Sequence, residues 1–220
     1  MTAPDAVLPD RPDEGAKRAL LALGFLAFLH LGGLQAAYGP SFAALQARHA
    51  VGVAEVGASV SAHFLGGFVG VLVSSLSLAA MGYRRVLLGA TMLTGAGAAA
   101  VGFAPSWQGV LLGALLIGFG YGHAVVLYNL LFARAFAPAG ASAVNLVNGA
   151  FGVGAVALPA AVALVTARLV AVDPARIAQA TPIVFGGAAL LALAVAVAIA
   201  RVPWLPAPVG RPRPRAAAAT

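Results

Sequence analysis

Six apolar segments of membrane-spanning length occupy most of this chain, with turn-forming residues between them. A stretch of about 20 apolar residues, when helical, matches the thickness of the hydrocarbon core of a bilayer. Such a helix also pairs its own backbone groups, as lipid requires. The sequence therefore predicts an all-α membrane protein with six transmembrane helices. The expected spans are residues 18–39, 55–80, 85–103, 107–134, 142–170 and 180–201.

The chain is expected to consist of a lead, a helical bundle and a tail. Gly39-Pro40 is expected to end the first span, because Gly and Pro favour turns. The spans form a bundle at residues 18–202, preceded by a Pro- and Asp-rich lead at 1–17 that we expect to be disordered. A Pro- and Arg-rich tail at 203–220 is expected to be extended and to touch anionic lipid.

Composition and charge exclude several classes of protein. Of the residues, 61% are hydrophobic and 9% are charged, so a soluble domain would lack a polar surface. The net charge is +7, but the basic residues are scattered between apolar spans, so we expect no nucleic-acid partner. Ten Lys and Arg residues fall on the side of the termini and three on the other. This bias predicts cytoplasmic N- and C-termini in a plasma (inner) membrane protein.

The titratable groups expected inside the bilayer are histidines. His30 and His63 are predicted near the midplane, and His123 nearer the inner leaflet, whereas no Asp or Glu lies inside a span, since Glu55 sits at the outer start of the second one. Ionisable residues at this depth are candidates for substrate or proton handling. The alternative is a neutral imidazole that bonds a neighbouring backbone carbonyl.

Other polar residues accompany these histidines. In the first span Gln35 and Tyr38 lie close to the face of His30, although Tyr38 also fits an interfacial aromatic anchor. In the fourth span Tyr121 and Tyr128 are seven apart on one face. We select as candidate solute contacts His30, Gln35, Tyr38, His63, Tyr128 and Asn129.

A second group of residues is expected to act in gating or helix packing. An Asn amide in lipid needs a partner, either on another helix or in a solute. A Pro inside a helix removes one backbone donor and bends or loosens the helix. The group consists of His123, Asn145, Asn148 and Pro159.

Catalytic signatures are missing from the sequence. It contains no Cys, no phosphate-cradling loop, no Ser-His-Asp set and no HExxH stretch. We therefore expect a protein that is not an enzyme and that uses neither a cofactor nor a metal.

Three stretches resemble the N-terminal six-helix half of the major facilitator superfamily. They are YGPSFAALQARHAVGVAEVGASVSAHFLGGFVG, LSLAAMGYRRVLLGATML and NLLFARAFAPAGASAVNLVNGAFGVGAVALPA, and the last is most similar to the fucose-permease-like sugar branch. In the second stretch Gly82, Arg84 and Arg85 match the Gly and basic positions of the family's loop after helix 2. Ala79 and Ala80 stand where the family carries Asp and Arg, of which the Asp helps to latch the outward-facing state.

The resemblance implies a function. Family members place two parallel halves around a central cavity, related by an axis along the membrane normal. We therefore expect a half-size transporter that acts as a homodimer and moves a small polar, sugar-like solute by alternating access. Its partners would be membrane lipid, a second copy and the solute. The alternatives are a non-transporting or heterodimeric subunit and an efflux carrier for apolar compounds.

Overall fold

The structure, a computed structural model, is an α-helical bundle and describes residues 12–203. Within this range it contains no strand. Five helical segments are long and apolar enough to cross a membrane, namely α1, α3, α4, α5 and the continuous η1–α6 segment. The elements are α1 (Glu14–Ala36), α2 (Tyr38–His49), α3 (Val53–Phe103), α4 (Trp107–Ala135), α5 (Gly140–Val172), the 3-10 helix η1 (Pro174–Gln179) and α6 (Ala180–Arg201).

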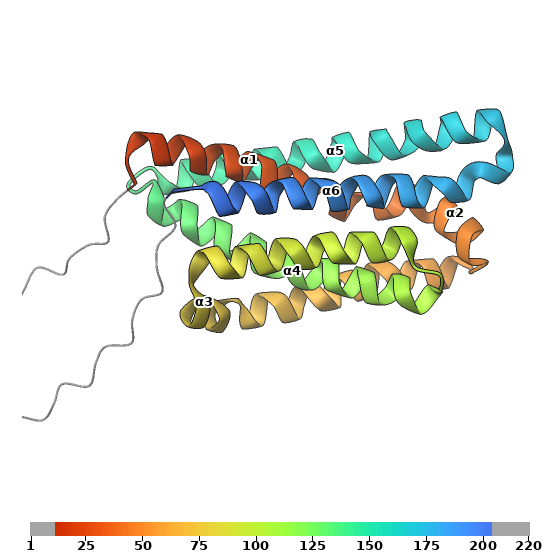
Figure 1. Ribbon diagram of the computed structural model, residues 1–220, viewed down its shortest axis with the longest axis horizontal. Coiled ribbons are helices and arrows are strands. Elements are labelled where there is room, and N and C mark those ends of the chain that lie inside the picture. Colours follow the sequence, from red (N-terminus) through yellow and green to blue (C-terminus); the bar gives the residue numbers. More distant parts are fainter. Residues whose placement is uncertain (1–11, 204–220) are drawn as a thin grey trace, which may run out of the picture.

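Helix α3 contains two crossings rather than one. Gly82 has φ 75° and ψ 166°, a backbone conformation that favours glycine, and the helix reverses its direction there (Figure 1). We call residues 53–81 the first arm and residues 83–103 the second arm. Counting both arms gives six crossings, so α1 begins and α6 ends at the same end of the bundle (Figure 1). The predicted fold class and the separation of the second and third spans are confirmed.

The region after the first span differs from expectation. Gly39-Pro40 was expected to end the helix, but both residues lie in the first turn of α2, and only Ala37 separates α1 from α2. Pro is tolerated there because the first turn leaves its backbone N–H groups unpaired in any case. The Ser41 hydroxyl donates to the Ala37 carbonyl oxygen over 2.7 Å, which ties the first turn of α2 to this linking residue.

The bundle begins slightly before its predicted start at residue 18. Helix α1 begins at Glu14, so residues 14–17 of the expected lead are helical, and the Asp13 carboxylate caps the helix by accepting from the Ala16 amide at 2.7 Å. The remainder of the lead, at 1–11, and the tail from 204 onward lie outside the described residues.

Glycines bring pairs of helices into backbone contact. The first arm of α3 lies on α4, where a Cβ on Gly66 would overlap the Leu115 carbonyl and a Cβ on Gly118 would overlap the His63 carbonyl. Likewise α1 lies on α5, where a Cβ on Gly154 would overlap the Leu29 carbonyl. Because apolar burial gives little driving force within lipid, such close packing holds membrane helices together.

Two helices present their faces outward. The first arm of α3 exposes large side chains such as Phe68 (62%) and Leu76 (71%), and α5 exposes Val156 (72%). A Cβ added to Gly149 or Gly152 of α5 would meet nothing within 4 Å. These faces are available to lipid or to another helical subunit.

Arg84, at the start of the second arm of α3, holds the end of α6. The Arg84 guanidinium donates to the carbonyl oxygens of Ile199, Ala200 and Val202, at 2.8, 2.7 and 2.5 Å. The last carbonyls of a helix lack intrahelical partners, so a cationic fork suits this position. Arg85 is exposed instead.

Candidate solute-binding site

An imidazole and two phenol rings meet inside the bundle. The ring centroid of His63, on the first arm of α3, lies 5.4 Å from that of Tyr38 and 5.5 Å from that of Tyr121. Tyr38 begins α2, and Tyr121 belongs to α4. Tyr121 in turn lies 6.4 Å from Phe151 of α5, again between centroids. Four helices therefore contribute to one aromatic cluster, which we call the His63 cluster and define as Tyr38, His63, Tyr121 and Phe151.

Two buried side chains of this cluster, His63 and Tyr38, lack hydrogen-bond partners within residues 12–203. His63 is 1% exposed, and within residues 12–203 neither of its ring nitrogens has a partner. The Tyr38 hydroxyl, on a side chain that is 3% exposed, is also unpaired in this part of the chain. A buried polar group without a partner costs about 1–3 kcal/mol, so native structures seldom keep one without a reason. These atoms are therefore suited to bind a polar solute.

His30 and Tyr128 lie in a different environment. Both line a small void of about 10 Å³ between α1, the second arm of α3, α4 and α6. The His30 Nε2 atom and the Tyr128 hydroxyl are buried and have no partner among the described residues. The Tyr128 ring packs against Phe28 with centroids 5.9 Å apart. The void is close to the size of one water molecule, so it is too small for a sugar.

The polar face predicted for the first span, residues 18–39, is thus divided between two places. His30 and Tyr38 were expected to share one cavity face, but Tyr38 joins the His63 cluster whereas His30 faces the void beside Tyr128. Tyr121 and Tyr128 divide in the same way, and it is Tyr121, which the site prediction left out, that contacts His63. Tyr121 and Tyr128 are seven residues apart, which places them on one face of α4 but at different heights along the helix. That separation could have suggested that they contact different neighbours.

The asparagines form an exposed polar pair. The Asn148 amide donates to the Asn129 side-chain oxygen over 3.1 Å and to the Val144 carbonyl over 2.8 Å, which links α5 to α4. Asn145 is exposed nearby on α5. Gln35 is half-buried, and its Oε1 atom has no partner within residues 12–203. Asn148 is therefore placed to pack helices, while Gln35 keeps a free acceptor.

His123 has the partners that the other two buried histidines lack. Its Nδ1 atom lies 3.1 Å from the Phe119 carbonyl oxygen and its Nε2 atom 3.2 Å from the Ser77 hydroxyl. Ser77 belongs to the first arm of α3, so the imidazole joins that arm to α4. Its geometry is that of a packing residue. Pro159 lies within α5, which runs as one helix from 140 to 172.

Comparison with known proteins agrees with this architecture. The profile of the "Sugar (and other) transporter" family matches residues 31–208 of the 220-residue chain. No curated protein matches the chain significantly. The match covers the C-terminal end of α1, from residue 31, and the five later crossings, and it includes every residue of the His63 cluster. The chain therefore belongs to the sugar (and other) transporter family of the major facilitator superfamily, and it is a multi-pass membrane transporter.

Proposed function

We propose that this protein carries a small, polar, sugar-like solute across the plasma membrane by alternating access. The observation that carries the proposal is the His63 cluster, where an imidazole and a phenol are buried without partners among the described residues of a chain of a transporter family. Hydroxyl groups of a sugar both donate and accept, so they suit an imidazole and a phenol in either role. Aromatic walls such as Tyr121 and Phe151 suit the apolar faces of a sugar ring.

The solute contacts are proposed in two groups. The inner group is Tyr38, His63 and the half-buried Gln35, whose polar atoms have no partner in the described part of the chain. The outer group is Asn129, which the solute would share with Asn148, and Asn145 on the same helix. His30 and Tyr128 are proposed to affect solute binding indirectly, through the void that they both line.

We further propose that the transporting unit is a homodimer with all termini in the cytoplasm. The exposed faces of α5 and the first arm of α3 support this, because both helices contribute a residue to the His63 cluster and α5 carries the open positions Gly149 and Gly152. Two parallel copies would then surround one cavity, as two halves do in this superfamily. A heterodimer with a different half would use the same faces.

Transport by the reconstituted full chain tests the central proposal. Proteoliposomes are loaded with unlabelled hexose, and counterflow of labelled hexose is measured for the wild type, His63→Leu and Gly57→Ala. Gly57 lies on the same helical arm, and its Cβ would meet nothing within 4 Å, so it is the matched control. We expect counterflow in the wild type and in Gly57→Ala, and a loss of at least about tenfold in His63→Leu, since both ring nitrogens lose a solute hydrogen bond of about 1 kcal/mol each. Equal transport by His63→Leu and the wild type would refute the assigned site.

Native mass spectrometry in lipid nanodiscs tests the homodimer. A dimeric mass supports two copies around one cavity. A monomer that is inactive alone and becomes active with a second protein half would replace the homodimer by a heterodimer.

A further inference from the structure

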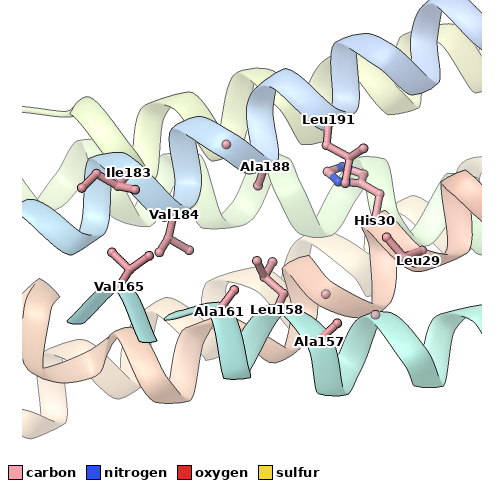
Figure 2. A pocket seen from close by; sticks show the side chains of 13 residues that line it. Leu29, His30, Ala157, Leu158, Ala161, Val165, Ile183, Val184, Ala188 and Leu191 are labelled. Carbon is pink, nitrogen blue, oxygen red and sulfur yellow. The ribbon is translucent and has the colours of Figure 1, made fainter. Parts of the chain in front are cut away.

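A second cavity lies on the side of the bundle between α1, α5 and α6. It has a volume of about 370 Å³, within the range of pockets that hold small molecules. Figure 2 shows side chains from the three helices converging on it. No residue of the His63 cluster lines it. Its walls include Leu29 and His30 of α1, Ala157, Leu158 and Ala161 of α5, and Ile183, Gly187, Ala188 and Leu191 of α6.

Small residues on facing helices leave this space open. Along α5 the wall carries Ala157 and Ala161, and along α6 it carries Gly187 and Ala188. A Cβ on Gly187 would meet nothing within 4 Å, in contrast to the glycines that hold α1 against α5. The cavity is therefore built into the sequence of α5 and α6.

The cavity also opens on the outer surface of the bundle. Its lining residues Leu29 and Ile183 are 37% and 51% exposed. In a membrane-spanning region these side chains meet lipid, so a molecule dissolved in the bilayer has access to the cavity. An apolar space that opens to lipid is filled by an apolar molecule.

The chemistry of the walls restricts the occupant. Every lining side chain is apolar except His30, which is 3% exposed and whose imidazole reaches the cavity from α1 (Figure 2). A sugar would leave most of its hydroxyl groups unpaired here, and a carboxylate or phosphate would bring a charge without a counter-charge. A neutral hydroxyl pairs with an imidazole in either tautomer, because it both donates and accepts.

We infer that this cavity binds a neutral lipid alcohol, with its hydrocarbon between α5 and α6 and its hydroxyl on the imidazole of His30. A bilayer molecule in this site would contact α1 directly at His30. The ring of His30 also lines the void beside Tyr128. The inference does not rest on the proposed solute or on the homodimer, since it concerns a different face of the bundle.

Photolabelling of the full chain in nanodiscs tests the site. The probe is a long-chain primary alcohol with a diazirine at the end of its chain, and the comparison probe is the matching alkane. Peptide mass spectrometry maps the labels. We expect the alcohol to label lining residues of α5 and α6, and the alkane to label them about fivefold less, as the loss of one hydrogen bond of about 1 kcal/mol implies.

Three variants decide the outcome. Gly187→Leu should fill the cavity and abolish this labelling, whereas Gly89→Leu should not change it, although a Cβ on Gly89 also meets open space. His30→Leu should reduce alcohol labelling to the level of the alkane. Labelling spread evenly over the lipid-facing surface, or unaffected by Gly187→Leu, would overturn the site. Equal labelling by both probes in the wild type would overturn the role of His30.

Discussion

Two histidines on the same helix pair have opposite environments. His63 on the first arm of α3 and His123 on α4 are both nearly inaccessible, with exposed fractions of 1% and 5%. Both ring nitrogens of His123 lie within hydrogen-bond distance of protein atoms, namely Phe119 and Ser77. Neither ring nitrogen of His63 has such a partner within residues 12–203.

The contrast separates a packing residue from a candidate binding residue. A satisfied imidazole between two helices acts as an interhelical hydrogen bond, which is worth about 0.6–1.7 kcal/mol in membranes. An unsatisfied one reduces stability, and a solute can offset that cost. Burial and residue type are the same for the two histidines, so only the neighbouring atoms distinguish them.

The largest expected effect comes from disrupting the contact between the first arm of α3 and α4, the two helical segments that carry His63 and His123. In Gly118→Leu the new side chain would overlap the His63 carbonyl, and backbone atoms cannot move aside as side chains do. We expect destabilisation of more than about 3 kcal/mol, and hence aggregation in detergent, seen by size-exclusion chromatography. Gly57→Ala on the first arm of α3 should elute normally, because its Cβ would meet nothing within 4 Å. Normal elution of Gly118→Leu would show that α3 and α4 are less tightly packed than described.

The next effect separates function from stability at His63. His63→Leu removes two unpaired nitrogens from an apolar setting, so it should leave stability within about 0.5 kcal/mol of the wild type or raise it. Counterflow should nevertheless fall at least about tenfold. Thermal unfolding followed by circular dichroism, together with counterflow on the same preparation, checks both. A strongly destabilised variant with normal specific transport would reverse the interpretation of this residue.

His123→Leu is expected to give the opposite pattern, with a smaller loss. It removes the bond to Ser77 and should destabilise the protein by about 1 kcal/mol, while transport per folded molecule stays within about twofold of the wild type. A double-mutant cycle with Ser77→Ala isolates the pair, because the single hydroxyl proton of Ser77 can instead go to the Val73 carbonyl oxygen, 3.0 Å away. Additive effects of the two changes would mean that the contact contributes no stability.

The smallest effect extends the comparison to the asparagines. Asn148 bonds Asn129 across two helices, whereas Asn145 is exposed one turn earlier without a bond in the described part of the chain. Asn148→Ala should cost about 0.6 kcal/mol and Asn145→Ala less than about 0.3 kcal/mol. Unfolding of both variants in the same detergent is the measurement, and a larger loss in Asn145→Ala would point to a partner of Asn145 outside this chain.

Most of the fold could be predicted because lipid imposes it. The six apolar spans follow from the length and internal pairing that a bilayer requires, and the last one matches α6 at residues 180–201. The exception is Gly39-Pro40, because the same residues that end a helix also fit the first turn of the next one. Local sequence does not distinguish these two outcomes.

The candidate site could be predicted only in part. Residue type and depth identified His30, His63 and His123 as the titratable groups within the spans, and helical spacing placed Tyr121 beside the face of Tyr128. The assignment of Tyr121 to His63, and of Tyr128 to Phe28 and the void beside His30, depends on which helices are neighbours. Glycine contacts between α1 and α5 and between α3 and α4 set those neighbours.

The sequence by itself determined the membrane location, the number of crossings and the set of polar residues available within the bundle. It did so because each of these depends on the solvent and on local hydropathy. Only the tertiary structure decided that His123 is paired, that His63 is not, and that His30 faces an apolar cavity. Hydrogen bonding and cavity shape depend on atoms from helices far apart in the sequence, so no single segment specifies them.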